Sequence, residues 1–500
     1  MRSTGVVEAA MPAFTRLAFT LGLVSLTTSA CKDQELETAG ELGDPCTPGD
    51  EAPCVAGLVC EPRSGDASYL CAGPIELRGM VIDAIDQTPI AGARVLALDD
   101  TSAPISDVAI TDAEGNYALP IAIPRDSDGN PATALTLTLQ GSAVDHQLYP
   151  SGLQPAFPVS TADVTPVEDD PDDASDDHLS IIENASTTIA LIPLEAADRG
   201  GFTISGRVAG DAGGGTLIVA EGGAAKHTIA DASGEFVLFN VQPGAWSLHG
   251  YRGGLQIQPA DVTVASADVG DVVLEVLDAS GAGTATVSGS VNIVNAPGGS
   301  MTSVVLIPSA VFIEAFEFGP VPYGLRAPSP GIAPNVSGAW TITGVPEGTY
   351  YVIASLENDL LVRDPDTNIA GTQIVEITVS AGQNFDVPDS FKITEALAVV
   401  GPGRDQPEEV SGTPIFEFAD DSSEDRYVVV VHDALGNEVW RDDQVPGVSG
   451  SATVVVPYAG PALTEGMYYR FQATSWKDAG SSSPISRTED LRGVFVYRGG

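Results

Sequence analysis

The sequence predicts an all-β protein, a string of β-sandwiches preceded by a small disulfide-rich module. Three observations lead to this fold class. The 500 residues include 54 Gly and 36 Pro spread between short apolar runs, a pattern typical of many turns and short strands. Outside residues 1–30, no long segment has the 3.6-residue apolar period of an amphipathic helix. Four cysteines lie within residues 46–71, and the chain is longer than one hydrophobic core usually holds.

The charge balance limits the partners. The chain has 22 Lys and Arg against 68 Asp and Glu, a formal net charge of −46. Such a surface repels phosphate backbones and anionic lipid headgroups, so we expect no nucleic-acid partner. It favours solubility and attracts divalent cations, and its simplest interpretation is a solvated acidic exterior.

Residues 1–30 have the pattern of a targeting segment. Arg16 precedes an apolar stretch over residues 17–26, which is too short to span a bilayer as a permanent helix. Small residues at positions 28–30 lead directly into Cys31. This arrangement resembles the lipobox of bacterial lipoproteins, in which signal peptidase II cleaves before a lipidated cysteine. The resemblance implies that Cys31 becomes the acylated N-terminus and anchors the chain to a membrane, and we expect the cell outer membrane or cell surface as its location.

Two alternatives concern this segment. Thr28 stands where Leu is most usual in a lipobox, so an ordinary signal peptide cut after Ala30 is the competing interpretation. The first ten residues include an acidic residue, so Met11 is an alternative start to Met1. An acidic tether, residues 31–45, follows the cleavage point and has the composition of a flexible linker.

The remaining cysteines predict disulfides. Four in so short a Gly/Pro-rich stretch of an exported chain are typical of a module too small to bury a sufficient core. A zinc site is the alternative, but there is no C-x2-C pair and no nearby His. Three pairings are possible, and we favour the interleaved one. The residues are Cys46, Cys54, Cys60 and Cys71, with Cys46–Cys60 and Cys54–Cys71 as the favoured bonds.

Three later segments repeat one order of events. Each opens with an apolar residue, a spacer, a Gly and a strand, and each later has a Gly followed two residues on by an aromatic. The later glycine is expected to supply a turn with positive φ, and the aromatic that follows it to face the core. The opening glycines are Gly79, Gly206 and Gly289, and the later pairs are Gly115–Tyr117, Gly234–Phe236 and Gly338–Trp340.

This repeat resembles the carboxypeptidase regulatory-like domain. The T-D-x-x-G-x-Y run over residues 111–117 is the closest match, segment two has A-D-x-x-G-x-F, and segment three lacks the Asp. The resemblance implies an Ig-like or prealbumin-like β-sandwich that shares its fold with starch-binding modules, and it indicates little about function.

Residues 124–180 are expected to be an insertion in the first repeat, ending in an acidic run that is typical of a solvated loop. The run RDSDGNP starts like a calcium loop, with Asp126, Asp128 and Asn130 as weak metal candidates. Pro131 and Leu137 stand where that loop needs Gly and Glu, so adventitious calcium is the lesser alternative.

From residue 392 the pattern changes to alternating apolar strands joined by an ALGN hairpin turn. The run Leu463-x-x-Gly466-x-x-Tyr469 resembles the tyrosine corner of fibronectin type III domains. The resemblance implies that the Tyr469 hydroxyl bonds to upstream backbone, with Leu463 and Gly466 as structural residues.

Catalytic motifs are absent from the sequence. It has no G-x-S-x-G, H-E-x-x-H, phosphate loop or G-x-G-x-x-G, and its five His lie in different segments. We therefore expect no enzyme, no catalytic residues and no cofactor, apart from the adventitious calcium.

The expected function is adhesion, display or scaffolding at the cell surface, with the protein or glycan partner unknown. The alternative is an array of carbohydrate-binding modules, for which Trp440 and Trp476 are the weak ligand-binding candidates because the repeat places Trp246 and Trp340 in core slots. The expected domains are residues 1–30 (signal peptide), 31–45 (tether), 46–74 (disulfide knot), 75–195, 200–278 and 284–391 (three repeat sandwiches) and 392–500 (fibronectin type III-like sandwich).

Overall fold

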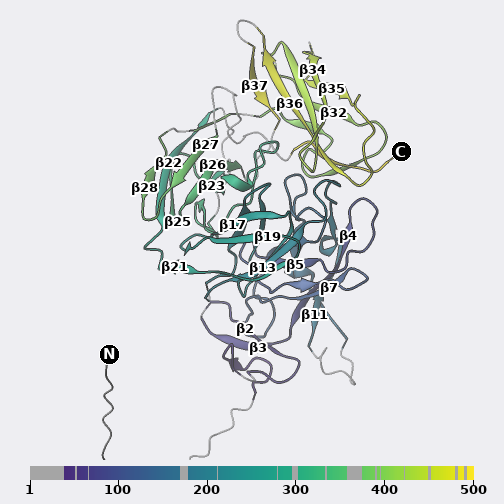
Figure 1. Cartoon of the computed structure of the whole chain (residues 1–500). Helices are drawn as coiled ribbons and strands as arrows, with labels where there is room; N and C mark the ends of the chain where they lie inside the picture. Colours follow the sequence, from purple (N-terminus) through teal and green to yellow (C-terminus); the bar gives the residue numbers. More distant parts are fainter. Residues whose placement is uncertain are drawn as a thin grey trace, which may run out of the picture. The chain divides into compact units, whose positions relative to one another are not determined.

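The computed structural model is all-β, with short 3₁₀ turns as its only helices among the residues it describes (Figure 1). Residues 40–500 form one unit. None of the described helices is long and apolar enough to cross a membrane. The described residues are 39–50, 53–65, 67–168, 178–210, 212–278, 280–294, 302–332, 335–356, 374–388, 391–394, 396–421, 423–448, 452–478, 482–488 and 492–499.

The disulfide-rich module is a three-stranded antiparallel sheet in the order β1-β3-β2. Its central strand, β3, places Cys71 directly opposite Cys60 of β2. The strands are β1 (Pro45–Cys46), β2 (Val59–Pro62) and β3 (Tyr69–Ala72).

The first sandwich packs a sheet built around β4 on a four-stranded sheet of order β6-β5-β8-β9. Apolar side chains of both sheets meet in one buried cluster that includes Leu77, Val95 and Leu139. The elements are β4 (Ile75–Asp83), β5 (Arg94–Leu98), β6 (Ala109–Ile110), β7 (Asn116–Pro120), β8 (Thr136–Ser142), β9 (Val159–Ser160), η1 (Thr161–Asp163), β10 (Thr165–Pro166), β11 (Ser180–Ile182), η2 (Ala185–Thr187) and β12 (Ile189–Leu191).

The structure corrects the expected insertion at residues 124–180. Strand β8 lies between β5 and β9, and it buries Leu137 and Leu139 in the sandwich core. The alternation T-L-T-L therefore marks a core strand of the first sandwich. The acidic run at residues 169–177 lies outside the described residues.

The second and third sandwiches share one plan. In each, the opening strand pairs with the strand that carries the later aromatic, and a second sheet covers them. The elements of the second are β13 (Phe202–Val208), β14 (Leu217–Glu221), β15 (Lys226–Ile229), β16 (Glu235–Val241), β17 (Gly244–Tyr251), β18 (Gln256–Ile257), β19 (Ala260–Val264), β20 (Val269–Leu274) and β21 (Val276–Asp278). Those of the third are β22 (Ala285–Val294), β23 (Thr302–Pro308), η3 (Ser309–Val311), β24 (Arg326–Ala327), β25 (Ala339–Val345), β26 (Gly348–Leu356), β27 (Val375–Val379), β28 (Asn384–Asp386) and β29 (Phe391–Thr394).

The opening glycine of each repeat lies directly opposite that repeat's aromatic on the neighbouring strand. The pairs are Gly79 with Tyr117, Gly206 with Phe236, and Gly289 with Trp340. A Cβ on any of these glycines would lie within 3 Å of the facing aromatic side chain. The opening glycine therefore leaves room for the ring to lie across the strand, and all three rings are buried.

The later glycine of the repeat behaves differently in the third segment. Gly115 and Gly234 have φ of 78° and 87°, as expected for the turn, and the turn Asp of each loop accepts two backbone N–H bonds. Gly338 has no positive φ, which corrects the expectation for this repeat. The third segment lacks the Asp, so the side chain that organises this turn is missing.

Replacing Gly206 by Ala should lower the free energy of unfolding by about 1–3 kcal/mol. The added Cβ would lie 2.0 Å from the carbonyl oxygen of Val272 and 2.9 Å from Cζ of Phe236, so the backbone must shift. Gly338→Ala is the matched control, since nothing lies within 4 Å of its Cβ position. Urea unfolding of the full chain compares the two, and equal effects would contradict the glycine–aromatic packing.

The C-terminal sandwich packs a three-stranded sheet, β30-β32-β35, on a larger sheet centred on β36 and β33. The amide N–H of Thr464 donates to the Tyr469 hydroxyl at 2.8 Å, a contact of the kind that a tyrosine corner makes. The strands are β30 (Val399–Gly401), β31 (Glu408–Val410), β32 (Ile415–Ala419), β33 (Arg426–Asp433), β34 (Glu438–Pro446), β35 (Thr453–Pro457), β36 (Tyr468–Lys477), β37 (Ser483–Arg487) and β38 (Val494–Tyr497).

Neighbouring sandwiches share hydrophobic clusters. Leu217 and Val219 of β14 belong to the core of the third sandwich, while the alternate residues Ile218 and Ala220 belong to their own. Both faces of β14 are therefore buried. The sandwiches are consecutive in sequence, but their cores are not independent.

Candidate functional site

Trp440, the first glycan-binding candidate, is part of a packed aromatic group. It lies on β34 opposite Val431, which is fully buried in the C-terminal core. Its ring centroid lies 5.3 Å from that of Tyr458, in an edge-to-face arrangement, and 6.1 Å from that of Phe416. This geometry is typical of core aromatics and not of an open sugar platform.

Trp476, the second candidate, lies on β36 opposite Arg426 of β33. The Arg426 guanidinium carbon lies 5.1 Å from the indole centroid. Arg426 and Val431 are five residues apart on one strand, so their side chains point to opposite faces of the sheet. Trp440 and Trp476 are therefore on opposite faces and cannot form a coplanar pair.

The Asp126 loop has the same turn geometry as other loops of this chain. The Asp126 Oδ1 accepts the backbone N–H bonds of Asp128 at 2.9 Å and Asn130 at 3.0 Å, and Gly129 has φ of 84°. Asp433 organises the ALGN hairpin with two equivalent bonds. One oxygen of the Asp126 carboxylate is thus used by the chain's own backbone, and a hairpin turn accounts for the D-S-D-G-N run without a metal.

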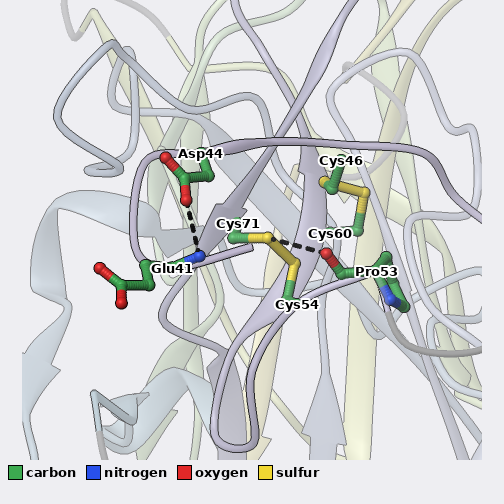
Figure 2. Close-up of a disulfide and its surroundings, with 7 residues drawn as sticks. All are labelled: Glu41, Asp44, Cys46, Pro53, Cys54, Cys60 and Cys71. Atoms are coloured by element: carbon green, nitrogen blue, oxygen red, sulfur yellow. Dashed lines mark hydrogen bonds between the residues drawn. A yellow bond between two sulfur atoms is a disulfide. The ribbon is translucent and has the colours of Figure 1, made fainter. Parts of the chain in front are cut away.

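The disulfide-rich module contains Cys46–Cys60 and Cys54–Cys71, the interleaved pairing (Figure 2). Within the described residues, the group of side chains close enough to share a metal is Cys46, Cys54 and Cys71, and all three are oxidised. The Sγ of Cys71 lies 3.5 Å from the carbonyl oxygen of Pro53, and Asp44 accepts the backbone N–H of Glu41 at 2.9 Å. The cysteines hold a fold that has little apolar core of its own.

Two buried charges dock this module on the first sandwich. Glu61 is only 6% exposed, and its carboxylate accepts the backbone N–H of Ile123 at 3.1 Å. Arg125 is 2% exposed and donates to the carbonyl oxygens of Gly73 at 3.0 Å and Gly129 at 3.2 Å. Burial raises the pKa of Glu61 to about 7, although the attraction of Arg125 and the bond from Ile123 act in the opposite direction.

The backbone completes the docking of the module. The Arg125 N–H donates to the carbonyl oxygen of Pro62 at 2.9 Å, and its own carbonyl accepts the N–H of Ser64 at 2.8 Å. The sequence analysis did not single out Glu61, and Arg125 entered it only as the first residue of the calcium-like run RDSDGNP, with no role for its charge.

A loop of the third sandwich inserts Phe316 into the C-terminal sandwich. Phe316 is 1% exposed and belongs to the C-terminal core. The Arg470 guanidinium carbon lies 5.4 Å from its ring centroid, and Arg470 Nη2 donates to the carbonyl oxygen of Ala315 at 2.8 Å. Glu317, the residue after Phe316, forms an ion pair with Arg487 at 3.0 Å.

Asn240 joins the first two sandwiches in a similar way. It has φ of 62°, which places its side chain toward the loop at residues 143–146. Its Oδ1 accepts the N–H of Asp145 at 2.6 Å, and its Nδ2 donates to the carbonyl oxygens of Ala143 and His146. Asn tolerates this backbone region better than most residues, which is a signal that sequence analysis could have used.

Cys31 lies outside the described residues, so its acylation stays a prediction. The five histidines are scattered in sequence, but the fold brings two of them to one cavity. His146 of the first sandwich and His227 of the second both line it. His146 Nε2 lies 3.2 Å from Asp83 Oδ2.

No family model matches the chain, and no curated protein matches it. Among solved structures it is similar to the Bacillus anthracis TIE protein, at 9% identity over 82% of this chain and 68% of that one, with a TM-score of 0.15. It is also similar to a streptococcal ancillary pilin, at 11% identity over 64% and 98% with a TM-score of 0.15. A tandem repeat from the extending region of a large adhesion protein matches at 14% identity over 84% and 100% with a TM-score of 0.13. Similarities this weak carry no functional argument.

Proposed function

We propose that the chain is an exported, non-catalytic surface protein, anchored by lipid at Cys31, whose sandwiches serve as a scaffold or adhesin. The continuity of burial across sandwich junctions carries this proposal. Val219 of the second sandwich packs in the core of the third, and Phe316 of the third packs in the core of the C-terminal sandwich. Such contacts resist bending between modules better than flexible linkers do, which suits a protein that must hold its domains in fixed register.

Two further features support an extracytoplasmic role. The two disulfides need an oxidising compartment to form and persist. The net charge of −46 keeps a surface-exposed chain soluble and away from anionic headgroups. The disulfide-rich module follows the tether directly, so it would be the first folded part beyond the membrane.

The lipid anchor is tested by metabolic labelling with a palmitate analogue in a Gram-negative host. The wild-type chain should take up label and fractionate with the outer membrane, and Cys31→Ala should do neither. Thr28→Leu, which brings the segment closer to the lipobox, is the control and should label at least as well as the wild type. Equal labelling of Cys31→Ala, or an unlabelled wild type, would refute lipidation at this residue.

A further inference from the structure

A cavity of about 630 Å³ lies within the unit formed by residues 40–500. The first sandwich contributes the outer face of β8, and the second contributes β15 and β16. Loops of the third and C-terminal sandwiches, which include Phe318 and Leu435, complete the lining. The volume lies in the range of small-molecule sites.

One wall of the cavity is a row of neutral polar side chains. Thr138, Gln140 and Ser142 alternate along β8, so they share one face of the strand, while Leu137 and Leu139 fill the core on the other. Among the described residues, the side chains of these three polar residues make no hydrogen bond. Gln140 is nevertheless only 8% exposed.

Strand β15, at the edge of its sheet, adds a hydroxyl and an imidazole to the lining. Thr228 is 6% exposed, and neither it nor His227 makes a side-chain hydrogen bond within the described part of the chain. Burial, together with the neighbouring ammonium of Lys226, lowers the pKa of His227 to about 4. The imidazole is therefore neutral at pH 7 and offers one donor and one acceptor.

Apolar groups border these polar walls, among them Leu148, Phe239 and Phe318. The charged groups in the lining are of both signs, and they include Lys226, Glu195 and Asp198. No single charge sign dominates the site. Neutral hydrogen-bonding groups between apolar surfaces therefore set its chemistry.

Buried polar side chains nearly always have a hydrogen-bond partner, from the protein, from water or from a ligand. Gln140 and Thr228 have none from the described protein and both line this cavity. We infer that the cavity binds an uncharged polyhydroxylated molecule of mono- to disaccharide size. Its hydroxyls would both donate to and accept from the amide, hydroxyl and imidazole groups, and its C–H faces would pack on the aromatic rings. This site is separate from the Trp440 and Trp476 candidates and does not depend on the proposed surface role.

Isothermal titration calorimetry on the full-length chain tests the inference. The probes are glucose, trehalose, maltose and N,N′-diacetylchitobiose, with glucuronate and glucosamine as charged counterparts. At least one neutral probe should bind with a Kd below about 10 mM, and more tightly than the charged ones. Gln140→Leu, which removes the amide at similar volume, should weaken that binding about tenfold.

Gln444→Leu, an amide removed from an exposed position on β34, is the matched control and should bind as the wild type does. If Gln140→Leu unfolds, Thr228→Val preserves side-chain shape and should weaken binding by a similar factor. Three results would overturn the inference: no neutral probe binds, the charged probes bind as well as the neutral ones, or the folded variants bind as the wild type does. In the first case the cavity holds water only.

Discussion

Phe316→Ala should reduce the free energy of unfolding by about 3–5 kcal/mol, the range for a fully buried Phe. The ring is 1% exposed in the C-terminal core. It also covers Arg470, whose guanidinium carbon lies 5.4 Å from the ring centroid. Its removal leaves a cavity beside a buried cation, and the loss of packing and of cation–π attraction act together.

Phe157→Ala is the matched control, since Phe157 is an aromatic with a 41% exposed side chain. Chemical unfolding of the full chain should show a change below about 1 kcal/mol for this variant. Hydrogen exchange should also locate the Phe316→Ala effect, with lost protection in both the third and the C-terminal sandwich. Equal, small effects of the two variants would show that these sandwiches do not share a core.

The close approach of Gly152 to Phe316 is independent evidence that the Phe316 ring is tightly packed. A Cβ on Gly152 would lie 2.4 Å from Cδ2 of Phe316, so the ring packs directly on the backbone of the first sandwich. Phe316 therefore belongs to the third sandwich and packs against both the first and the C-terminal sandwich. A single aromatic in this position can couple the stabilities of these sandwiches, so its truncation is expected to have a large effect.

The fold class follows from local pattern, and the structure shows why. Alternating apolar residues, turn glycines and the repeated aromatic each act within one sandwich, over a few residues of sequence. The repeat marked both Gly206 and Phe236, but their pairing across 30 residues of one sandwich is seen only in the structure. The disulfides could also be predicted locally, because the four cysteines are close in sequence and the chain is expected to be exported to an oxidising compartment.

The junctions between sandwiches were not predicted, because they depend on which outward faces meet. One signal was present: the run L-I-V-A at residues 217–220 is apolar on both faces, and both are buried. Phe316 gave no such signal, since it is one of several apolar residues in the run V-F-I-E-A-F-E-F at residues 311–318, and nothing in that run distinguishes it from its neighbours. Gln140 fits the alternation of a half-exposed strand, and no sequence pattern shows that its outward side faces a cavity.

Glu61→Gln should stabilise the docking of the disulfide-rich module at pH 8 and leave it almost unchanged at pH 4. The pKa of Glu61 rises from an ordinary 4.5 to about 7 in the folded chain, so the folded state holds this proton more tightly than the unfolded state. The associated stability is complete below pH 4.5 and is lost as the pH rises through 7. With about 1.4 kcal/mol for each tenfold change in proton affinity, the loss by pH 8 is about 3 kcal/mol.

Glutamine resembles the protonated carboxyl, so the variant should lack this loss. The 68 acidic residues make the total stability strongly pH-dependent, but their contributions cancel in the difference between variant and wild type. Hydrogen exchange of the segments at residues 59–62 and 121–125 measures the docking directly at each pH. Glu76→Gln is the control, because that carboxylate forms a surface ion pair with Arg78 at 2.9 Å and contributes little.

The attraction between Glu61 and Arg125 opposes the cost of burying the Glu61 carboxylate. Arg125 is only 2% exposed. If that attraction outweighed the cost of burying the carboxylate, Glu61→Gln would leave an uncompensated buried cation and destabilise the docking at pH 8 by several kcal/mol. The sign of the change at pH 8 therefore decides between the two effects. A stabilised variant means that this contact weakens as the pH rises from about 4.5 to 7, so the disulfide-rich module would be held most firmly in acidic surroundings.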